Sequence, residues 1–313
     1  MFKIFNNFNI PRNLKKSILL IGNFDGLHLG HQKIFKEAKR YSKKNKLKIG
    51  VLTFDPLPIM FFNKKIKNYR LTNKEQKLFL LKKIGVNFII NKKFNRSFSK
   101  IKSENFIRKI VFKKINPKFI FVSNNFRFGN NRKGNVEELR KKEKNFKYKV
   151  VKLSPLKYKT KIVSSTRIRK LLQKGKIRHA NKLLSRNWSV SGFVSKGKSL
   201  GKKLGYPTCN IKLKDYIIPK IGVYSVKIQI KDSKKILNGI ANLGFRPTFG
   251  GKKLILEVNL FGFSGNLYKK ILKVYFCDFI RSEKKFKNKF LLISQIKKDL
   301  RKAKIHLRKK IIL

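Results

Sequence analysis

The sequence predicts two domains: an α/β domain with a doubly wound parallel sheet, followed by a small antiparallel β-barrel that ends in a helix. Three observations predict this architecture. The chain has 313 residues, whereas one domain usually takes about 100–200 residues. Its first half alternates short apolar runs with helical stretches. Its second half is a series of period-two runs without helices between them. We place the boundary after residue 184, which gives domains of 1–184 and 185–313.

In the first domain, apolar runs bounded by polar turns predict buried strands at 17–22, 48–54, 86–90, 118–122 and 148–153. Apolar side chains at helical spacing predict helices at 30–44 and 74–84, and a helical tail at 166–184. Strands that alternate with helices favour a parallel sheet, and such sheets bind ligands at the carboxyl ends of their strands. The loop after the first strand is therefore the first place to search for a site.

In the second domain, six period-two runs separated by Gly, Pro and Asn predict a six-stranded antiparallel barrel. The runs are 188–194, 208–213, 222–230, 235–243, 254–261 and 269–280. A last helical stretch, 282–307, is expected to pack on the barrel.

The formal net charge of +67, from 81 Lys and Arg against 14 Asp and Glu, raises nucleic-acid binding as one interpretation. Lysines far outnumber arginines and are scattered, whereas base reading and phosphate recognition favour Arg. The excess of Lys, Asn, Ile and Phe is typical of drift in an AT-rich genome, as in reduced bacterial endosymbionts. We interpret the charge as a solvated surface without a specific nucleic-acid partner, and expect only non-specific binding to polyanions.

The two cysteines, Cys209 and Cys277, lie far apart in apolar, strand-like surroundings, which indicates neither a disulfide framework nor a metal cluster. The N-terminus lacks an apolar core of signal-peptide length, and no window approaches the ~18 uncharged residues of a membrane span. We therefore expect a cytoplasmic protein that acts without a membrane, as a monomer or with weak self-association.

The loop after the first strand contains an HxGH motif at the start of a helix. His28 and His31 are three residues apart, so both can face one ligand. The helix N-terminus offers backbone N–H groups, and Gly30 allows phosphate oxygens to approach the backbone. Two of the four histidines in the chain occur here, which favours a triphosphate site over a capped helix with two surface histidines. The other candidates for ATP binding in this loop are Gly22, Phe24, Asp25 and Gly26.

A second motif, Ser164-Ser165-Thr166 followed by Arg169, stands at the start of the helical tail. Alone it is typical of a helix cap. Together with HxGH it resembles the adenylyl- and cytidylyltransferase superfamily. The resemblance implies that the hydroxyls, the helix N-terminus and Arg169 hold the β and γ phosphates, which leave as pyrophosphate, and a planar guanidinium suits that task.

Two further segments, 54–58 and 122–129, resemble those of the prokaryotic FAD synthetase module. The resemblance implies nucleotide or flavin contacts for Phe54, Pro56, Asn125, Phe126 and Phe128. For Phe126 and Phe128, roles as core and turn residues remain an alternative. The sequence departs from the family pattern at Leu57 and Ser123.

The first barrel run leads into a glycine-rich stretch, 192–210, whose backbone could wrap a phosphate tail, although it could also be a tight hairpin. Thr208 and Asn210 are two apart on an extended segment, so both project to one face, where a hydroxyl and an amide oxygen suit Mg²⁺. The stretch resembles the riboflavin kinase pattern, with Lys202 in place of Arg. Its candidates for ATP binding are Gly192, Gly197, Lys203, Gly205 and Pro207.

Acidic residues are scarce past residue 185, and Glu257 is the one expected in mid-strand, on the face opposite its neighbours. In riboflavin kinases the matching Glu accepts the proton of the ribityl 5′-hydroxyl, so the resemblance implies that Glu257 is the general base. A barrel-wall Glu paired with a lysine is the alternative. By the same resemblance, Arg281 and Glu283 contact the flavin. Departures from the family pattern occur at Asn259, Gly262, Asn266 and Lys269.

These motifs together predict an enzyme that phosphorylates riboflavin to FMN in the second domain and adenylylates FMN to FAD in the first, with ATP as co-substrate and Mg²⁺ as cofactor. Two alternatives remain at this point. One is a chain in which only one step is active and the other domain is a scaffold. The other is a basic nucleic-acid-binding protein on a nucleotidyltransferase fold.

Overall fold

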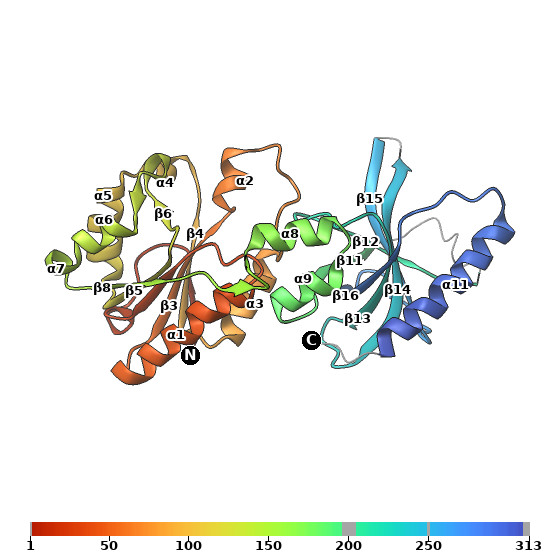
Figure 1. Cartoon of the computed structure of the whole chain (residues 1–313), viewed down its shortest axis with the longest axis horizontal. Helices are drawn as coiled ribbons and strands as arrows, with labels where there is room; N and C mark the ends of the chain where they lie inside the picture. Colours follow the sequence, from red (N-terminus) through yellow and green to blue (C-terminus); the bar gives the residue numbers. More distant parts are fainter. Residues whose placement is uncertain (1, 196–204, 249–250, 309–313) are drawn as a thin grey trace. The chain divides into compact units, whose positions relative to one another are not determined.

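The computed structural model describes residues 2–195, 205–248 and 251–308. By its internal contacts the chain divides into two compact units (Figure 1). The first unit consists of Met1–Lys67 and Lys74–Ser164, and the barrel unit consists of Asn68–Asn73 and Ser165–Leu313. The helical tail at 166–184 thus groups with the barrel by its contacts. The functional boundary expected after residue 184 stays a prediction.

The first unit is built on a six-stranded parallel sheet of order β1-β4-β3-β2-β5-β8. The strands are β1 (Lys3–Phe5), β2 (Ile18–Ile21), β3 (Ile49–Asp55), β4 (Phe88–Lys93), β5 (Phe119–Ser123) and β8 (Lys149–Leu153). The five predicted strands are confirmed. The sixth, β1, was not predicted, because its three residues contain no buried apolar run.

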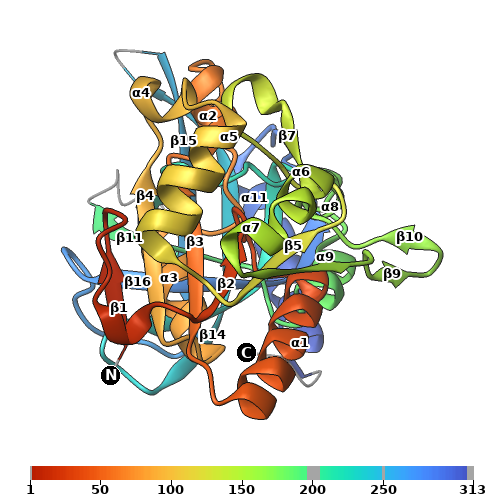
Figure 2. The ribbon, with the colours of Figure 1, turned by 90° about the vertical axis from the view of Figure 1, so that its left-hand side faces the viewer.

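Helices cover both faces of this sheet, as the doubly wound prediction requires. Leu19 and Ile21 pack in one core with the π-helix η2 (Phe106–Ile115), whereas Ile18 and Leu20 pack in a second core with α1 (Leu29–Asn45). Figure 2 looks at this unit with η2 in front of the sheet. The other helices are α2 (Pro58–Phe62), α3 (Lys74–Lys83), α4 (Arg96–Ser99), α5 (Ser103–Asn105), α6 (Val136–Lys141), α7 (Glu143–Phe146), η1 (Arg12–Leu14) and η3 (Asn130–Arg132).

Two short hairpins complete the first unit. They are formed by β6 (Arg127–Phe128) with β7 (Gly134–Asn135), and by β9 (Lys157–Tyr158) with β10 (Lys161–Ile162). The second hairpin leads directly to the Ser164-Ser165-Thr166 motif.

The barrel unit contains the predicted closed antiparallel barrel, of order β11-β12-β15-β14-β13-β16. Its strands are β11 (Ser189–Ser195), β12 (Cys209–Lys212), β13 (Gly222–Ile230), β14 (Ile236–Thr248), β15 (Gly251–Leu260) and β16 (Ile271–Arg281). The last helix, α11 (Lys289–Arg308), begins later than predicted and packs against β13, β14 and β16. Neither α11 nor another helix of the described chain is long and apolar enough to cross a membrane.

Two features of the barrel unit differ from the prediction. The helical tail is two helices, α8 (Ser165–Gln173) and α9 (Ile177–Leu184), because the chain turns at Gly175, whose φ of +72° favours glycine. The segment 68–73, from the middle of the first half of the sequence, joins the barrel unit. There the N–H of Ile217 donates to the carbonyl of Arg70 at 2.8 Å, and the indole of Trp188 donates to the carbonyl of Leu71 at 2.8 Å.

Candidate active sites

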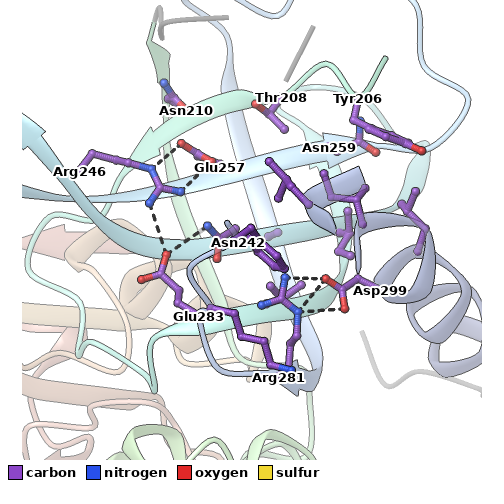
Figure 3. A pocket seen from close by; sticks show the side chains of 18 of the residues that line it. Tyr206, Thr208, Asn210, Asn242, Arg246, Glu257, Asn259, Arg281, Glu283 and Asp299 are labelled. Carbon is purple, nitrogen blue, oxygen red and sulfur yellow. Dashed lines mark hydrogen bonds and ion pairs between the residues drawn. The ribbon is translucent and has the colours of Figure 1, made fainter. Parts of the chain in front are cut away.

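The barrel unit has a pocket of 410 Å³ whose walls come from β14, β15, the start of β12, the end of β16, and α11 (Figure 3). Polar and apolar side chains share its lining. Five of the residues predicted from sequence line it together: Thr208, Asn210, Glu257, Arg281 and Glu283. The pocket therefore unites the predicted metal, base and flavin residues of the second domain in one place.

Strand geometry explains why these side chains meet. Asn210 and Glu257 are direct partners across β12 and β15. Leu256 and Val258, on either side of Glu257, are fully buried, so the alternation along β15 turns the carboxylate to the opposite face, as predicted. Thr208 lies two residues before Asn210 and lines the same pocket. Hydroxyl, amide and carboxylate oxygens are the hard donors that Mg²⁺ prefers, so this set fits the metal.

Glu257 is engaged by an arginine that sequence reasoning did not single out. Arg246 Nε lies 3.0 Å from Glu257 Oε1, and its Nη2 lies 3.2 Å from Oε2. Arg246 Nη1 also lies 3.4 Å from Glu283 Oε1, which accepts a further bond from Asn242 Nδ2 at 3.3 Å. The hydrogen bonds to Glu257 raise the pKa of Arg246, so the guanidinium stays charged. The partner of Glu257 is thus an arginine, Arg246, and not the lysine of the alternative interpretation.

A second ion pair at the pocket was also missed. Arg281 Nε lies 2.8 Å from Asp299 Oδ2, and its Nη2 lies 2.7 Å from the same oxygen. Gln295 donates to Asp299 Oδ1 at 2.8 Å. Asp299 is buried, and Figure 3 shows Arg281 held against it from the facing strand. The sequence signal was an isolated acid in a helix, which does not reveal its partner.

The predicted ATP-binding glycines of the second domain have different surroundings. Gly205 and Pro207 line a more open depression of 510 Å³ that shares Tyr206 and Asn259 with the pocket. Asn259 Nδ2 donates to the Pro207 carbonyl at 2.7 Å, so this departure from the family pattern has a structural contact. Gly192 lies in β11, where a Cβ would collide with the side chain of Ile211. Gly197 and Lys203 lie outside the described residues.

In the first unit, the HxGH motif forms the start of α1. His28 is the N-cap of α1, and its Nδ1 accepts a hydrogen bond from the backbone N–H of His31 at 3.3 Å. The two imidazole rings stack with their centroids 3.7 Å apart. A neutral His28 that accepts this bond on Nδ1 carries its proton on Nε2. A Cβ on Gly30 would lie 3.1 Å from the carbonyl of Val163, so the residue before Ser164 packs closely against the motif.

The loop before α1 is packed by its own side chains. Phe24 is buried with a φ of +46°, and its ring contacts that of His31 at 5.3 Å. Gly22 gives this ring its space, because a Cβ there would lie 3.1 Å from it. Asp25 is buried and Gly26 has a φ of +81°. Phe24, in the space that Gly22 leaves, therefore lies against His31.

The second phosphate motif lies at the border of the two units. Ser164 ends the first unit, whereas Ser165, Thr166 and Arg169 belong to α8 in the barrel unit. Arg169 is buried, its Nε donates to the Tyr69 carbonyl at 2.8 Å, and its guanidinium carbon lies 3.7 Å from the centre of the Tyr69 ring. Its role toward phosphates stays a prediction.

Three of the five predicted flavin residues of the first unit, Phe54, Phe126 and Phe128, contact other aromatic side chains. Phe128 is buried in the core and stacks on the partly buried Phe126 at 5.5 Å. Phe54, two residues before Pro56, has its ring centroid 5.5 Å from that of Phe98. Asn125 is exposed and accepts a bond from Ser123 Oγ at 3.0 Å. Their contacts with flavin also stay predictions.

A parallel-sheet unit with HxGH at its helix start, joined to a barrel with a carboxylate-bearing pocket, defines a two-part nucleotide-dependent transferase. The family model of FAD synthetase matches residues 10–167, and that of riboflavin kinase matches residues 184–307. Together they cover most of the sequence. The chain belongs to the bifunctional riboflavin kinase/FMN adenylyltransferase family.

Curated relatives of that name agree over nearly the full length. The protein of Buchnera aphidicola subsp. Schizaphis graminum is 43% identical, over 92% of this chain and 94% of its own. Those of Haemophilus influenzae and Escherichia coli K12 are 37% and 33% identical, over 95% and 90% of this chain and 96% and 90% of their own. The resemblance to an endosymbiont protein agrees with the drifted composition.

A solved structure supports the fold as well. A crystal structure described as a macrolide-efflux protein from Streptococcus pneumoniae has a TM-score of 0.85 and 28% identity, and covers 97% of this chain and 98% of that one. The described efflux role is that protein's own. The family assignment of this chain rests on the two family models and the curated relatives.

Proposed function

We propose that the chain phosphorylates riboflavin to FMN with ATP in the second predicted domain, 185–313, and adenylylates FMN to FAD with a second ATP in the first, 1–184, releasing pyrophosphate. The observation that carries the proposal is the pocket that Thr208, Asn210 and Glu257 share. Relatives that are 33–43% identical over at least 90% of this chain bear both activities in their names.

In the kinase step, the ribityl 5′-hydroxyl of riboflavin attacks the γ-phosphorus of ATP. Glu257 accepts the hydroxyl proton, because its carboxylate is the acid that faces the pocket next to Thr208 and Asn210. Arg281 and Glu283 contact the flavin. Thr208 and Asn210 would hold Mg²⁺, which supplies positive charge to the phosphate oxygens.

In the adenylyl step, a phosphate oxygen of FMN attacks the α-phosphorus of ATP and pyrophosphate leaves. His28 Nε2–H, His31 and the N–H groups at the start of α1 stabilise the charge that develops on the α-phosphate. No covalent intermediate on the protein is needed. The β and γ phosphates are held by Ser164, Ser165, Thr166 and Arg169, and the flavin by Phe54, Pro56, Asn125, Phe126 and Phe128.

The setting follows from this chemistry. The substrates are small molecules, and we assign no specific nucleic-acid partner. The demand for ATP, and two thiols without a disulfide in the described chain, suit a reducing cytoplasm. We expect a monomer or weak self-association, which sedimentation analysis would test.

Two parallel incubations test the proposal. The protein is mixed with riboflavin, ATP and Mg²⁺, or with FMN in place of riboflavin, and the flavins are resolved by chromatography. FAD in both mixtures, with FMN as an intermediate in the first, is expected. FMN alone, or FAD only from supplied FMN, would reduce the claim to one step. No product, together with salt-sensitive RNA binding, would favour the nucleic-acid alternative.

A further inference from the structure

The pocket holds its proposed base, Glu257, in an ion pair that proton transfer to the base would weaken. Both oxygens of Glu257 contact Arg246, at 3.0 and 3.2 Å, in a fork-to-fork arrangement (Figure 3). A carboxylate has about four lone-pair sites and this fork uses two of them, so Glu257 can accept a proton while it is paired. Proton uptake neutralises Glu257 and removes most of its attraction for the guanidinium, whereas the phosphoryl oxygens of ATP stay negative. The guanidinium is therefore expected to move from Glu257 toward the phosphoryl group during the reaction.

The two guanidinium groups that line the pocket, those of Arg246 and Arg281, differ in how exposed they are. The side chains of Arg246 and Glu257 are 37% and 29% exposed, and partly exposed ion pairs of this kind contribute little net stability, so their partners exchange at low cost. The side chains of Arg281 and Asp299 are only 17% and 4% exposed, and separating them would leave a buried charge unpaired. Arg246 is thus the one of the two that can change partner.

A second carboxylate, that of Glu283, also reaches Arg246. Asn242, Gly244 and Arg246 lie on one face of β14, and a Cβ on Gly244 would collide with the carboxylate of Glu283. Glycine therefore lets Glu283 reach across the strand to Arg246 Nη1 at 3.4 Å. The guanidinium bridges two acids, and release of Glu257 leaves it anchored at Glu283.

We propose that Arg246 is a further catalytic residue, which exchanges Glu257 for the transferred phosphoryl group when ATP and riboflavin fill the pocket. In that step the riboflavin 5′-oxygen bonds to the γ-phosphorus, and the bond from that phosphorus to the β,γ-bridging oxygen breaks. The bond electrons leave with ADP, and the hydroxyl proton passes to Glu257. The guanidinium fork neutralises charge on the equatorial phosphoryl oxygens, where this transition state carries it.

The exchange thus couples two events, since the guanidinium leaves Glu257 as the carboxylate takes up the proton and places its positive charge on the phosphoryl group. The inference rests on the proposed kinase function. Wild-type protein is assayed first, because absence of FMN formation there refutes the proposed function itself. All that follows presumes that wild-type protein makes FMN.

The test compares Arg246→Gln, Arg246→Ala and Arg246→Lys with Arg178→Gln, which breaks an arginine–carboxylate pair in the same unit away from the pocket. For Arg246→Gln, kcat of FMN formation should fall about 10²–10³-fold, with KM for riboflavin and ATP within about threefold. Lysine should restore kcat only partly, because a point charge lacks the fork. Arg178→Gln should keep the wild-type kcat.

Two further readouts separate contact with the phosphoryl group from mere positioning of Glu257. Added guanidinium ion should restore part of the kcat of Arg246→Ala. Arg246→Gln should weaken binding of ADP with aluminium fluoride, a mimic of the transferred group, by about the factor lost in kcat, while ADP alone binds as before. A wild-type kcat in Arg246→Gln, or a lowered kcat with neither rescue nor weaker analogue binding, would overturn the inference. FAD formation from supplied FMN, and the fluorescence of Trp188, verify that each variant is folded.

Discussion

The ion pair of Arg281 and Asp299 allows the loss of stability in a variant to be predicted in kcal/mol. Asp299→Asn keeps the shape of the side chain but removes the charge that Arg281 contacts at 2.7 and 2.8 Å. Loss of one partner of a buried ion pair costs about 3–5 kcal/mol. Since the amide oxygen can still accept one bond and the side chain of Arg281 is 17% exposed, we expect a loss somewhat below this range, about 2–3 kcal/mol.

Thermal unfolding followed by tryptophan fluorescence measures this loss of stability in the barrel unit. Trp188 is the only tryptophan of the chain and is buried in the barrel unit, so its fluorescence reports unfolding there. In a unit of this size 1 kcal/mol moves the melting temperature by about 2–4 °C, so Asp299→Asn should melt about 4–12 °C below wild type.

A matched control lies on the same helix. Lys298→Gln also changes one charge, at an exposed position of α11, and should melt within about 2 °C of wild type. Because Arg281 lines the pocket, KM for riboflavin should rise in Asp299→Asn more than kcat falls. A melting temperature equal to that of Lys298→Gln would refute the idea that this buried pair fastens α11 to β16.

Three other predictions follow from the two sites. Replacement of His28 or His31 by Ala should abolish FAD formation from FMN but leave FMN formation intact, because the histidines and the kinase pocket belong to separate units; chromatography that shows both products lost would contradict this. Glu257→Gln should slow FMN formation about 10²–10⁴-fold while supplied FMN still becomes FAD, and an unaltered kinase rate would exclude the base role. Burial raises the pKa of Cys209 to about 11 and of Cys277 to about 12, so both thiols should react far more slowly with a disulfide reagent at pH 8 in native than in denatured protein. The stability linked to these raised values is complete at pH 8 and is lost as the pH passes through them; equal native and denatured reaction rates would disprove the assignment.

Most of the fold could be predicted because the pattern of the sequence matches its burial. In β2, Leu19 and Ile21 face one core and Ile18 and Leu20 the other, so a short continuous apolar run was enough to indicate a buried parallel strand. In the barrel strand β15, Leu256, Val258 and Leu260 are buried and the residues between them are not, so the sequence alternates there. The missed strand β1 has no such mark, since its residues are mostly exposed and its order comes from backbone pairing with β4.

The residues of the candidate kinase site could be predicted only where their placement follows from the pattern within a single strand. Thr208 and Asn210 could be placed together from their spacing, and Glu257 from its polar character between two apolar neighbours. Arg246 could not be placed, because its contact with Glu257 depends on the register between β14 and β15, which the pattern does not specify. Asp299 reaches Arg281 only because α11 folds back along the barrel.

The rare residue types of this chain are more informative than the abundant one. Three of the 14 acidic residues, Glu257, Glu283 and Asp299, line one pocket, and each contacts an arginine there. Two of the four histidines lie at the start of α1, His28 as its N-cap and His31 in its first turn. In a chain with 81 Lys and Arg, a surface lysine carries little information, whereas a carboxylate kept on the wall of a pocket costs desolvation and needs a partner or a task. The +67 charge therefore describes the surface of the molecule, and the few acids and histidines indicate where its chemistry takes place.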